Sequence, residues 1–239
     1  MSYGRIGVIG AMDSELAALI AALAQPARET VQGLAFHTGR LGAREVVLVR
    51  CGIGKVSAAR CTQVLIDRFA PAAVINTGIA GGLGAGLAVG DIVVADGLVQ
   101  HDFDAAPIGF VRGCLCMGDP SAPTVFTPDE PLSALLARTA GDAAGAQRVH
   151  RGLIATGDQF ISGAAAKAAL RRAFPSAMAA EMEGGAVAQA ASMSGVPFAV
   201  VRTISDLADG TAAASFEQFE QHAADVSAAA VLQALALLD

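Results

Sequence analysis

The feature that most constrains the fold is an apolar run at residues 198–204 that ends abruptly in Ser205 and Asp206. A short apolar run bounded by polar residues is typical of a strand buried on both faces, which implies a parallel sheet covered by helices. Ligands bind such sheets in the crevice beyond the carboxyl ends of the strands. Asp206 is therefore expected at the ligand-binding edge.

Two other apolar segments end in acids. Residues 5–10 lead through a short connection to Glu15, and residues 179–183 close with Glu181 and Glu183. If these strands are parallel neighbours of the run before Asp206, then Glu15, Glu183 and Asp206 converge on one edge of the sheet. Three acids gathered at the ends of neighbouring strands favour a functional role.

Strands and helices alternate along the chain, which predicts an α/β fold in a single domain spanning residues 1–239. The expected strands are 5–10, 33–38, 45–50, 73–77, 91–96, 151–156, 179–183 and 198–204. The expected helices are a first helix that Pro26 ends, followed by 55–69, 163–173, 183–194 and 216–238. The stretch from His101 to Leu132 carries many prolines and glycines, so we expect a loop that shapes the site or a subunit contact.

Composition narrows the function classes. Hydrophobic residues make up 54% and charged residues only 16%, which favours a homo-oligomer. No apolar run reaches the 18 or so residues that a membrane span needs, and no leader-like segment precedes the first strand, so we expect a cytoplasmic protein without a membrane partner. The net charge is −6, with no basic cluster and no Trp, which argues against nucleic acid as a partner.

A metal site is not expected from the cysteines and histidines. The four cysteines and four histidines are scattered, and the only close cysteine pair, Cys114 and Cys116, lacks the second pair that zinc spacing requires. Free thiols are the simpler interpretation, and we expect no metal and no cofactor.

Two glycine-rich segments suggest nucleotide binding, with different strength. Residues 51–57 lack the third glycine of the dinucleotide fingerprint, so that interpretation is weak. Residues 76–82 are expected to form a turn whose glycines let the backbone approach a ligand, although a plain tight connection is an equally good interpretation.

Four residues have both a functional and a structural interpretation. Glu15 begins a helix, where a carboxylate is common, but this helix follows a buried strand and so starts at the ligand edge. Glu183 also begins a helix, and its carboxylate suits the vicinal hydroxyls of a ribose. Met182 offers a soft apolar contact or core filling. Phe160 could stack on a flat base or fill a gap.

Seven motifs in fixed order extend over nearly the whole chain, and together they resemble the bacterial 5′-methylthioadenosine/S-adenosylhomocysteine nucleosidases of the nucleoside phosphorylase/hydrolase superfamily. They are residues 7–15, 51–57, 76–82, 89–94, 156–161, 181–183 and 201–206. The resemblance implies a three-layer α/β sandwich with a central mixed, mostly parallel sheet, a homodimer, and cofactor-free hydrolysis of the N-glycosidic bond of adenine thionucleosides.

The resemblance also implies roles for individual residues. Glu15 would activate water, and Asp206 would protonate the purine at N7. The other site residues would contact substrate: Met182 and Glu183 the ribose, Phe160 and the backbone of Ile161 the adenine, Gly81 the ribose and base, and Phe216 the 5′ substituent. Glu181, Ser205 and Ile79 complete the expected substrate-binding set.

The chemistry is compatible with these roles. Departure of a purine leaves an oxocarbenium-like sugar, so the reaction needs an acid for the leaving base and a base for water, as in glycoside hydrolysis. We expect desolvation to raise the pKa of Asp206, and the helix terminus to keep Glu15 anionic.

The chain departs from the family pattern at the sugar and 5′ side. Ile79 stands where a serine is common, and Ala105, Ile108 and Cys116 replace bulkier residues or proline. The 5′ group is therefore left open, and an aminodeoxyfutalosine hydrolase is an alternative. A purine nucleoside phosphorylase is less favoured because Glu15 would repel phosphate, and a non-catalytic nucleoside sensor is the remaining alternative.

Overall fold

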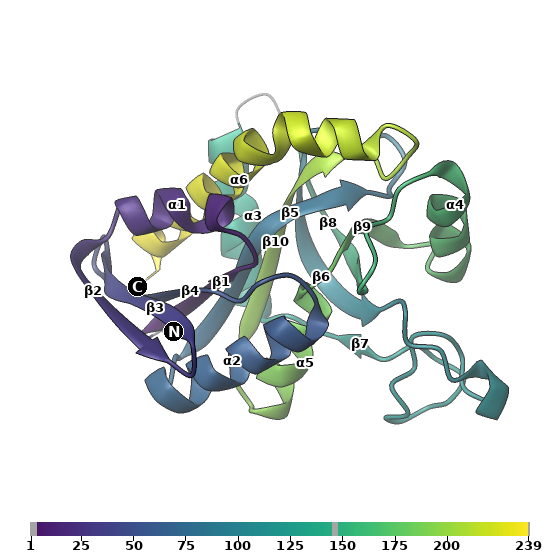
Figure 1. Cartoon of the computed structure of the whole chain (residues 1–239), viewed down its shortest axis with the longest axis horizontal. Helices are drawn as coiled ribbons and strands as arrows, with labels where there is room; N and C mark the ends of the chain where they lie inside the picture. Colours follow the sequence, from purple (N-terminus) through teal and green to yellow (C-terminus); the bar gives the residue numbers. More distant parts are fainter. Residues whose placement is uncertain (1–3, 145–147, 239) are drawn as a thin grey trace.

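The structure is a computed structural model that describes residues 4–144 and 148–238 (Figure 1). Its strands are β1 (Ile6–Gly10), β2 (Ala24–Val31), β3 (Leu34–Leu41), β4 (Arg44–Arg50), β5 (Ala73–Gly82), β6 (Ile92–Gln100), β7 (Val125–Phe126), β8 (Val149–Thr156), β9 (Ala177–Glu181) and β10 (Phe198–Asp206). Its helices are α1 (Asp13–Ala21), α2 (Lys55–Phe69), α3 (Glu130–Ala144), α4 (Ala164–Ala173), α5 (Gly184–Met193), α6 (Ala212–Leu237) and the short 3₁₀ helix η1 (Ala106–Ile108).

The strands form one mixed sheet, in agreement with the expected α/β class. Strands β4, β1, β5 and β10 are parallel neighbours, and so are β6, β8 and β9. Antiparallel pairs between β10 and β6 and between β5 and β9 join the two groups, so that β5, β10, β6, β8 and β9 close into a ring. Strand β5 lies between β1 and β10, and therefore between the segments that carry Glu15 and Asp206.

Helices cover both faces of the sheet. Helices α2 and α5 pack together on one face, and α1, α3 and α6 pack on the other (Figure 1). Each face has its own layer of buried aliphatic side chains. This covering explains why the middle of β10 is apolar on both faces, and it leaves the strand ends as the place for polar groups.

The prediction that the first helix continues to Pro26 was wrong. Helix α1 ends at Ala21, and Pro26 lies in strand β2. Strand β2 is the last strand at one edge of the sheet and pairs only with β3 among the described strands. An edge strand tolerates proline because one side of its backbone needs no ladder hydrogen bond.

The turn predicted at residues 76–82 is not present, because strand β5 continues through these residues to Gly82. A β-carbon at Gly78 would lie 2.4 Å from Oε1 of Glu15, and one at Gly81 would lie 3.0 Å from Oδ1 of Asp206. These glycines therefore allow the side chains of Glu15 and Asp206 to approach the strand closely, and they do not reverse the direction of the chain.

The proline-rich stretch is less irregular than expected, because it contains η1 and β7 and its end belongs to α3. Pro131 lies in the first turn of α3, where the missing N–H has no helical partner to lose. The last helix also begins earlier than predicted, at Ala212 instead of Phe216.

Candidate active site

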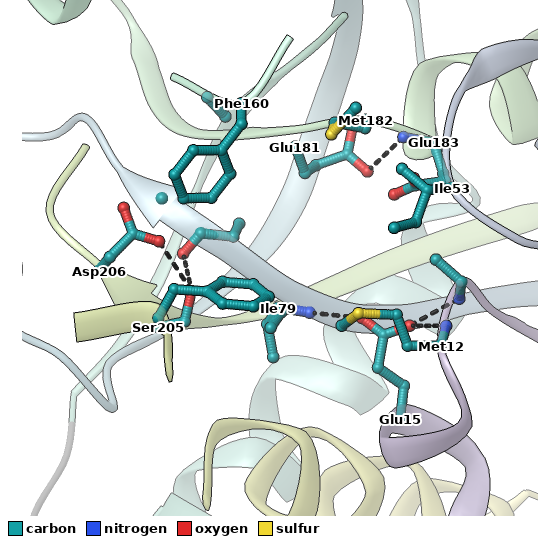
Figure 2. Close-up of a pocket in the computed structure, with 15 residues that line it drawn as sticks. Met12, Glu15, Ile53, Ile79, Phe160, Glu181, Met182, Glu183, Ser205 and Asp206 are labelled. Atoms are coloured by element: carbon teal, nitrogen blue, oxygen red, sulfur yellow. Dashed lines mark hydrogen bonds between the residues drawn. The ribbon is translucent and has the colours of Figure 1, made fainter. Parts of the chain in front are cut away.

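A cavity opens at the carboxyl ends of β1, β5 and β10. Every site residue named from the sequence lines it, except Ile161, whose side chain packs against the cluster around Leu170 and Phe174. The lining residues are Ala11, Met12, Glu15, Ile53, Ile79, Ala80, Gly81, Phe160, Ala180, Glu181, Met182, Glu183, Ser205, Asp206 and Phe216. Figure 2 shows Phe160 and Asp206 at one end and Met12 and Ile53 at the other.

Glu15 is held by three backbone donors. Its Oε2 accepts hydrogen bonds from the N–H groups of Ala11, at 2.6 Å, and Met12, at 3.0 Å. Its Oε1 accepts one from the N–H of Ile79, at 3.1 Å (Figure 2). The contact from residue 79 uses the backbone, so it is independent of the isoleucine side chain.

The electrostatics of Glu15 differ from the sequence expectation. Burial raises the pKa of Glu15 above its ordinary value, while Arg202 and the three backbone N–H groups act in the opposite direction. The N–H groups at the start of the helix therefore favour the anion together with Arg202 and the N–H of Ile79. Desolvation has the larger effect, so the net pKa of Glu15 is raised. A carboxylate with a raised pKa is a stronger base than an exposed one, which suits proton abstraction from water.

Behind the cavity, Glu181 forms a buried ion pair with Arg202. The Nη2 atom of Arg202 lies 2.5 Å from Oε2 of Glu181, and both side chains are 2% exposed. Glu181 also accepts hydrogen bonds from the hydroxyl of Thr156 and the N–H groups of Glu183 and Gly184. This pair fixes the end of β9 and sets the position at which Met182 and Glu183 emerge.

Glu183 reaches across to the loop before α2. Its Oε1 accepts a hydrogen bond of 2.8 Å from the N–H of Gly54, whose φ of +96° favours glycine. The next amide, that of Lys55, donates to Asp158, and the Lys55 ammonium lies 2.6 Å from Asp102. Burial and the nearby Glu181 raise the pKa of Glu183 to about 8.

Asp206 lies opposite Gly81 of β5, on the other side of that strand from Glu15. Its Oδ1 accepts a hydrogen bond from the N–H of Ala208, at 2.8 Å, and its Oδ2 accepts one from the hydroxyl of Ser205, at 2.9 Å. Burial raises its pKa, as expected from the sequence, although both hydrogen bonds act the other way. A carboxyl group with a raised pKa can hold a proton for transfer.

Two aromatic rings line the cavity: Phe160 lies near Asp206, and Phe216 also packs against the cluster that contains Ile79. Phe160 and Phe216 meet edge to face, with ring centroids 5.7 Å apart. Phe160 is 48% exposed, a high fraction for a large apolar side chain, and its ring faces the cavity (Figure 2). A flat heterocycle between this ring and the cavity wall would cover that exposed face.

The described residues contain no group of three or more metal-ligating side chains arranged to hold an ion. No helix in residues 4–144 and 148–238 combines the length and apolarity that a membrane crossing requires.

Sequence reasoning missed some residues at the site. Arg202 was the most informative omission, since an arginine inside an otherwise apolar strand signals a buried charge with a partner. Met12 and Ile53 line the cavity but carried no signal of their own, because apolar residues in connecting segments are common.

Comparisons with known proteins identify the family of this chain. Residues 5–236 match the family described as the Phosphorylase superfamily. A 5′-methylthioadenosine/S-adenosylhomocysteine nucleosidase from Actinobacillus succinogenes is 41% identical over 235 residues, which cover 98% of this chain and 100% of the relative. The chain belongs to the 5′-methylthioadenosine/S-adenosylhomocysteine nucleosidase family of this superfamily.

Solved structures of this family share the fold. A nucleosidase from Colwellia psychrerythraea 34H, in complex with adenine, superposes with a TM-score of 0.93 at 39% identity, covering 100% of this chain and 96% of that one. The native structure of futalosine hydrolase from Helicobacter pylori strain 26695 superposes with a TM-score of 0.88 at 32% identity, covering 97% of each chain. The nucleosidase fold is thus shared with an enzyme named for a different nucleoside.

Proposed function

We propose that this protein hydrolyses the N-glycosidic bond of 5′-methylthioadenosine and S-adenosylhomocysteine, releasing adenine and the 5′-thioribose. The observation that carries the proposal is the position of Glu15 and Asp206 on either side of β5, on one cavity. Two carboxyl groups in this arrangement can serve the two faces of a sugar whose bond to the base is breaking.

In the proposed mechanism, Asp206 donates a proton to N7 of the departing adenine, and the electrons of the C1′–N9 bond leave with the base. Glu15 takes a proton from the water that attacks C1′. Asp206 then takes up a proton from solvent, and Glu15 releases its proton to solvent. Both carboxyl groups are thereby restored to their starting states.

We assign substrate contacts to the rest of the cavity. Met182 and Glu183 hold the ribose, and with a pKa of about 8 the Glu183 carboxyl can both donate to and accept from its hydroxyls. Phe160 stacks on adenine, the backbone of Ile161 reads its edge, and Phe216 closes over the 5′ substituent. Gly81, Ile79, Glu181 and Ser205 shape the wall around these groups.

Hydrolysis is favoured over phosphorolysis by the charge of the cavity. Its lining includes four carboxyl groups and, among the described residues, no lysine or arginine side chain. A phosphate dianion near C1′ would meet Glu15 in a desolvated site, where like charges repel by several kcal/mol. Phosphate sites instead use arginine side chains and free N–H groups.

The test is adenine release from dialysed, chelator-treated enzyme in phosphate-free buffer. We expect full activity and a free reducing sugar as the second product. Activity that depends on phosphate and yields a ribose-1-phosphate product would assign the protein to the phosphorylases.

Hydrolysis of aminodeoxyfutalosine is the second candidate. It is supported by the likeness to futalosine hydrolase and by Ala105, Ile108 and Cys116, which are small or aliphatic where bulkier residues or proline are common. Adenine release measured side by side for the three nucleosides distinguishes the candidates.

We also propose a cytoplasmic homodimer that acts in methionine salvage. The exposed apolar side chains of Ile108, Val111 and Met117 belong to the segment 105–131, which we expect to complete the site of the neighbouring subunit. Dilution to monomer should then lower activity, and sedimentation that finds a fully active monomer would contradict the shared site.

A further inference from the structure

A second cavity borders the substrate cavity at the end that lies away from Asp206. We call it the mouth cavity, and it has a volume of about 470 Å³. Both cavities are lined by Ala11, Met12 and Ile53, so they lie next to each other at these residues. Figure 2 shows these two side chains at the end of the substrate cavity away from Asp206, which is where a 5′ substituent would leave the ribose.

The mouth cavity is charged, in contrast to the apolar passage that leads to it. Arg50 at the end of β4, Asp13 at the start of α1 and Glu220 on α6 all line it. The Nη1 atom of Arg50 lies 3.3 Å from Oδ2 of Asp13, in an exposed ion pair. The hydroxyl of Ser14 donates a 2.8 Å hydrogen bond to Oε1 of Glu220, which fixes that carboxylate at the wall.

The positive side of the mouth cavity is extended by a third cavity. Arg50 and Asp13 also line this neighbouring space, which Arg28 and His37 border from strands β2 and β3. The arginines Arg28 and Arg50 thus lie on the strand side, while the acids Asp13 and Glu220 lie on the helix side, and Asp13 pairs with Arg50.

From this separation of charge we propose that the mouth cavity binds a zwitterionic α-amino acid group at the end of the 5′ substituent. Arg50 receives its carboxylate, and Glu220 receives its ammonium. The inference rests on the proposed hydrolase function and deepens it, since it selects the homocysteinyl nucleoside as the substrate whose whole tail is recognised.

Other 5′ tails match these charges less well. A methylthio group ends in the apolar passage and leaves both charged groups in water. A tail that carries only an aryl carboxylate can pair with Arg50, but it has no cation for Glu220 and brings an apolar ring into a charged cavity. Only the zwitterion can form one ion pair with Arg50, through its carboxylate, and a second with Glu220, through its ammonium.

The experiment compares kcat/KM for adenine release from S-adenosylhomocysteine, its decarboxylated analogue and 5′-methylthioadenosine. The variants are Arg50→Gln and Glu220→Gln, with Arg138→Gln on the exposed surface of α3 as a matched control. The readout is the preference for each charged nucleoside over the methylthio nucleoside, so a general loss of activity cancels.

Arg50→Gln should lower the preference for S-adenosylhomocysteine about fivefold and leave the preference for the decarboxylated analogue unchanged, since exposed charge pairs give modest energies. Glu220→Gln should lower both preferences by a similar factor. Added salt should also lower the preference of the wild type for S-adenosylhomocysteine over 5′-methylthioadenosine, because salt screens exposed charges.

Equal losses for all three nucleosides in Arg50→Gln, or no change in any preference, would overturn the proposed clamp. Activity of the wild type on none of the three nucleosides would instead refute the hydrolase function. The two failures are therefore distinguishable.

Discussion

The two ends of the substrate cavity are built differently: the end with Glu15 and Glu181, which we assign to the sugar, and the end with Asp206 and Phe160, which we assign to the base. At the sugar end, Glu15 is held by three backbone N–H groups, and Glu181 is held by a hydroxyl, two amides and Arg202. At the base end, Asp206 has two hydrogen bonds and Phe160 is half exposed. The carboxylates at the sugar end are thus held by more protein groups than Asp206 is, and we expect the exposed ring of Phe160 at the base end to gain packing from the ligand.

This difference fits the chemistry required at each end. The water and the developing positive charge at C1′ have no rigid frame of their own, so the protein must supply preorganised dipoles there. Adenine is flat and stiff, and it can stack on the exposed ring of Phe160. We therefore expect substitutions at the sugar end to lower the rate of the chemical step. At the base end we expect a change of Asp206 to affect proton transfer and a change of Phe160 to affect substrate binding.

The largest effect is expected for Glu15→Gln. The amide keeps the size of the side chain but cannot accept a proton from water, so kcat should fall by about 10⁴, the upper range for general acid–base catalysis. Binding of a non-hydrolysable adenosine analogue, measured by calorimetry, should change little. Retained turnover would show that another group activates the water.

Asp206→Asn should lower kcat by about 10²–10⁴, because the amide has no transferable proton. Single-turnover kinetics should place the loss in bond cleavage, with little change in affinity. A substrate with a better leaving base, which needs less protonation, should recover part of the rate in Asp206→Asn but not in Glu15→Gln. Equal recovery in both variants would remove the distinction between the two ends.

The shared location of these carboxyl groups could be anticipated because each follows a buried strand, and such strand ends meet at one edge of a parallel sheet. Other parts of the molecule could not be predicted because a local signal was ambiguous. Pro26 is compatible with a helix stop and with an edge strand, and Gly78 is compatible with a turn and with a strand position where a missing side chain makes room for Glu15. The partner of Arg202 depended on the pairing of distant strands.

The third prediction concerns stability at the sugar end. Glu181→Gln removes the carboxylate that pairs with the fully buried Arg202 and leaves an uncompensated charge, which should cost about 3–5 kcal/mol of unfolding free energy. Ser205→Ala is the matched change at the base end, where loss of one hydrogen bond should cost about 1 kcal/mol. Urea unfolding measures both. Similar costs would contradict the proposed difference in rigidity.

A fourth prediction uses the raised pKa of Glu183, about 8 against an ordinary value of 4.5. Between these pH values the folded protein holds a proton that the unfolded chain has lost, so this group makes stability fall as pH rises. The melting temperature of wild-type protein should therefore decrease from pH 5 to pH 8 more steeply than that of Glu183→Gln. Parallel curves would mean that Glu183 titrates in its ordinary range.

The smallest effect is expected for Phe160→Leu at the base end. Leucine keeps an apolar contact but loses the flat face, and stacking on a base is worth about 1–3 kcal/mol, so KM should rise about fivefold to tenfold while kcat stays within about twofold. Because the sugar end is already held by the protein, bond cleavage should not depend on this ring. Phe216→Leu provides the control, since Phe216 contacts Phe160 but is assigned to the 5′ substituent. A fall in kcat with unchanged KM for Phe160→Leu would mean that the ring orders the acid or excludes water during cleavage, and the base end would then be part of the preorganised site.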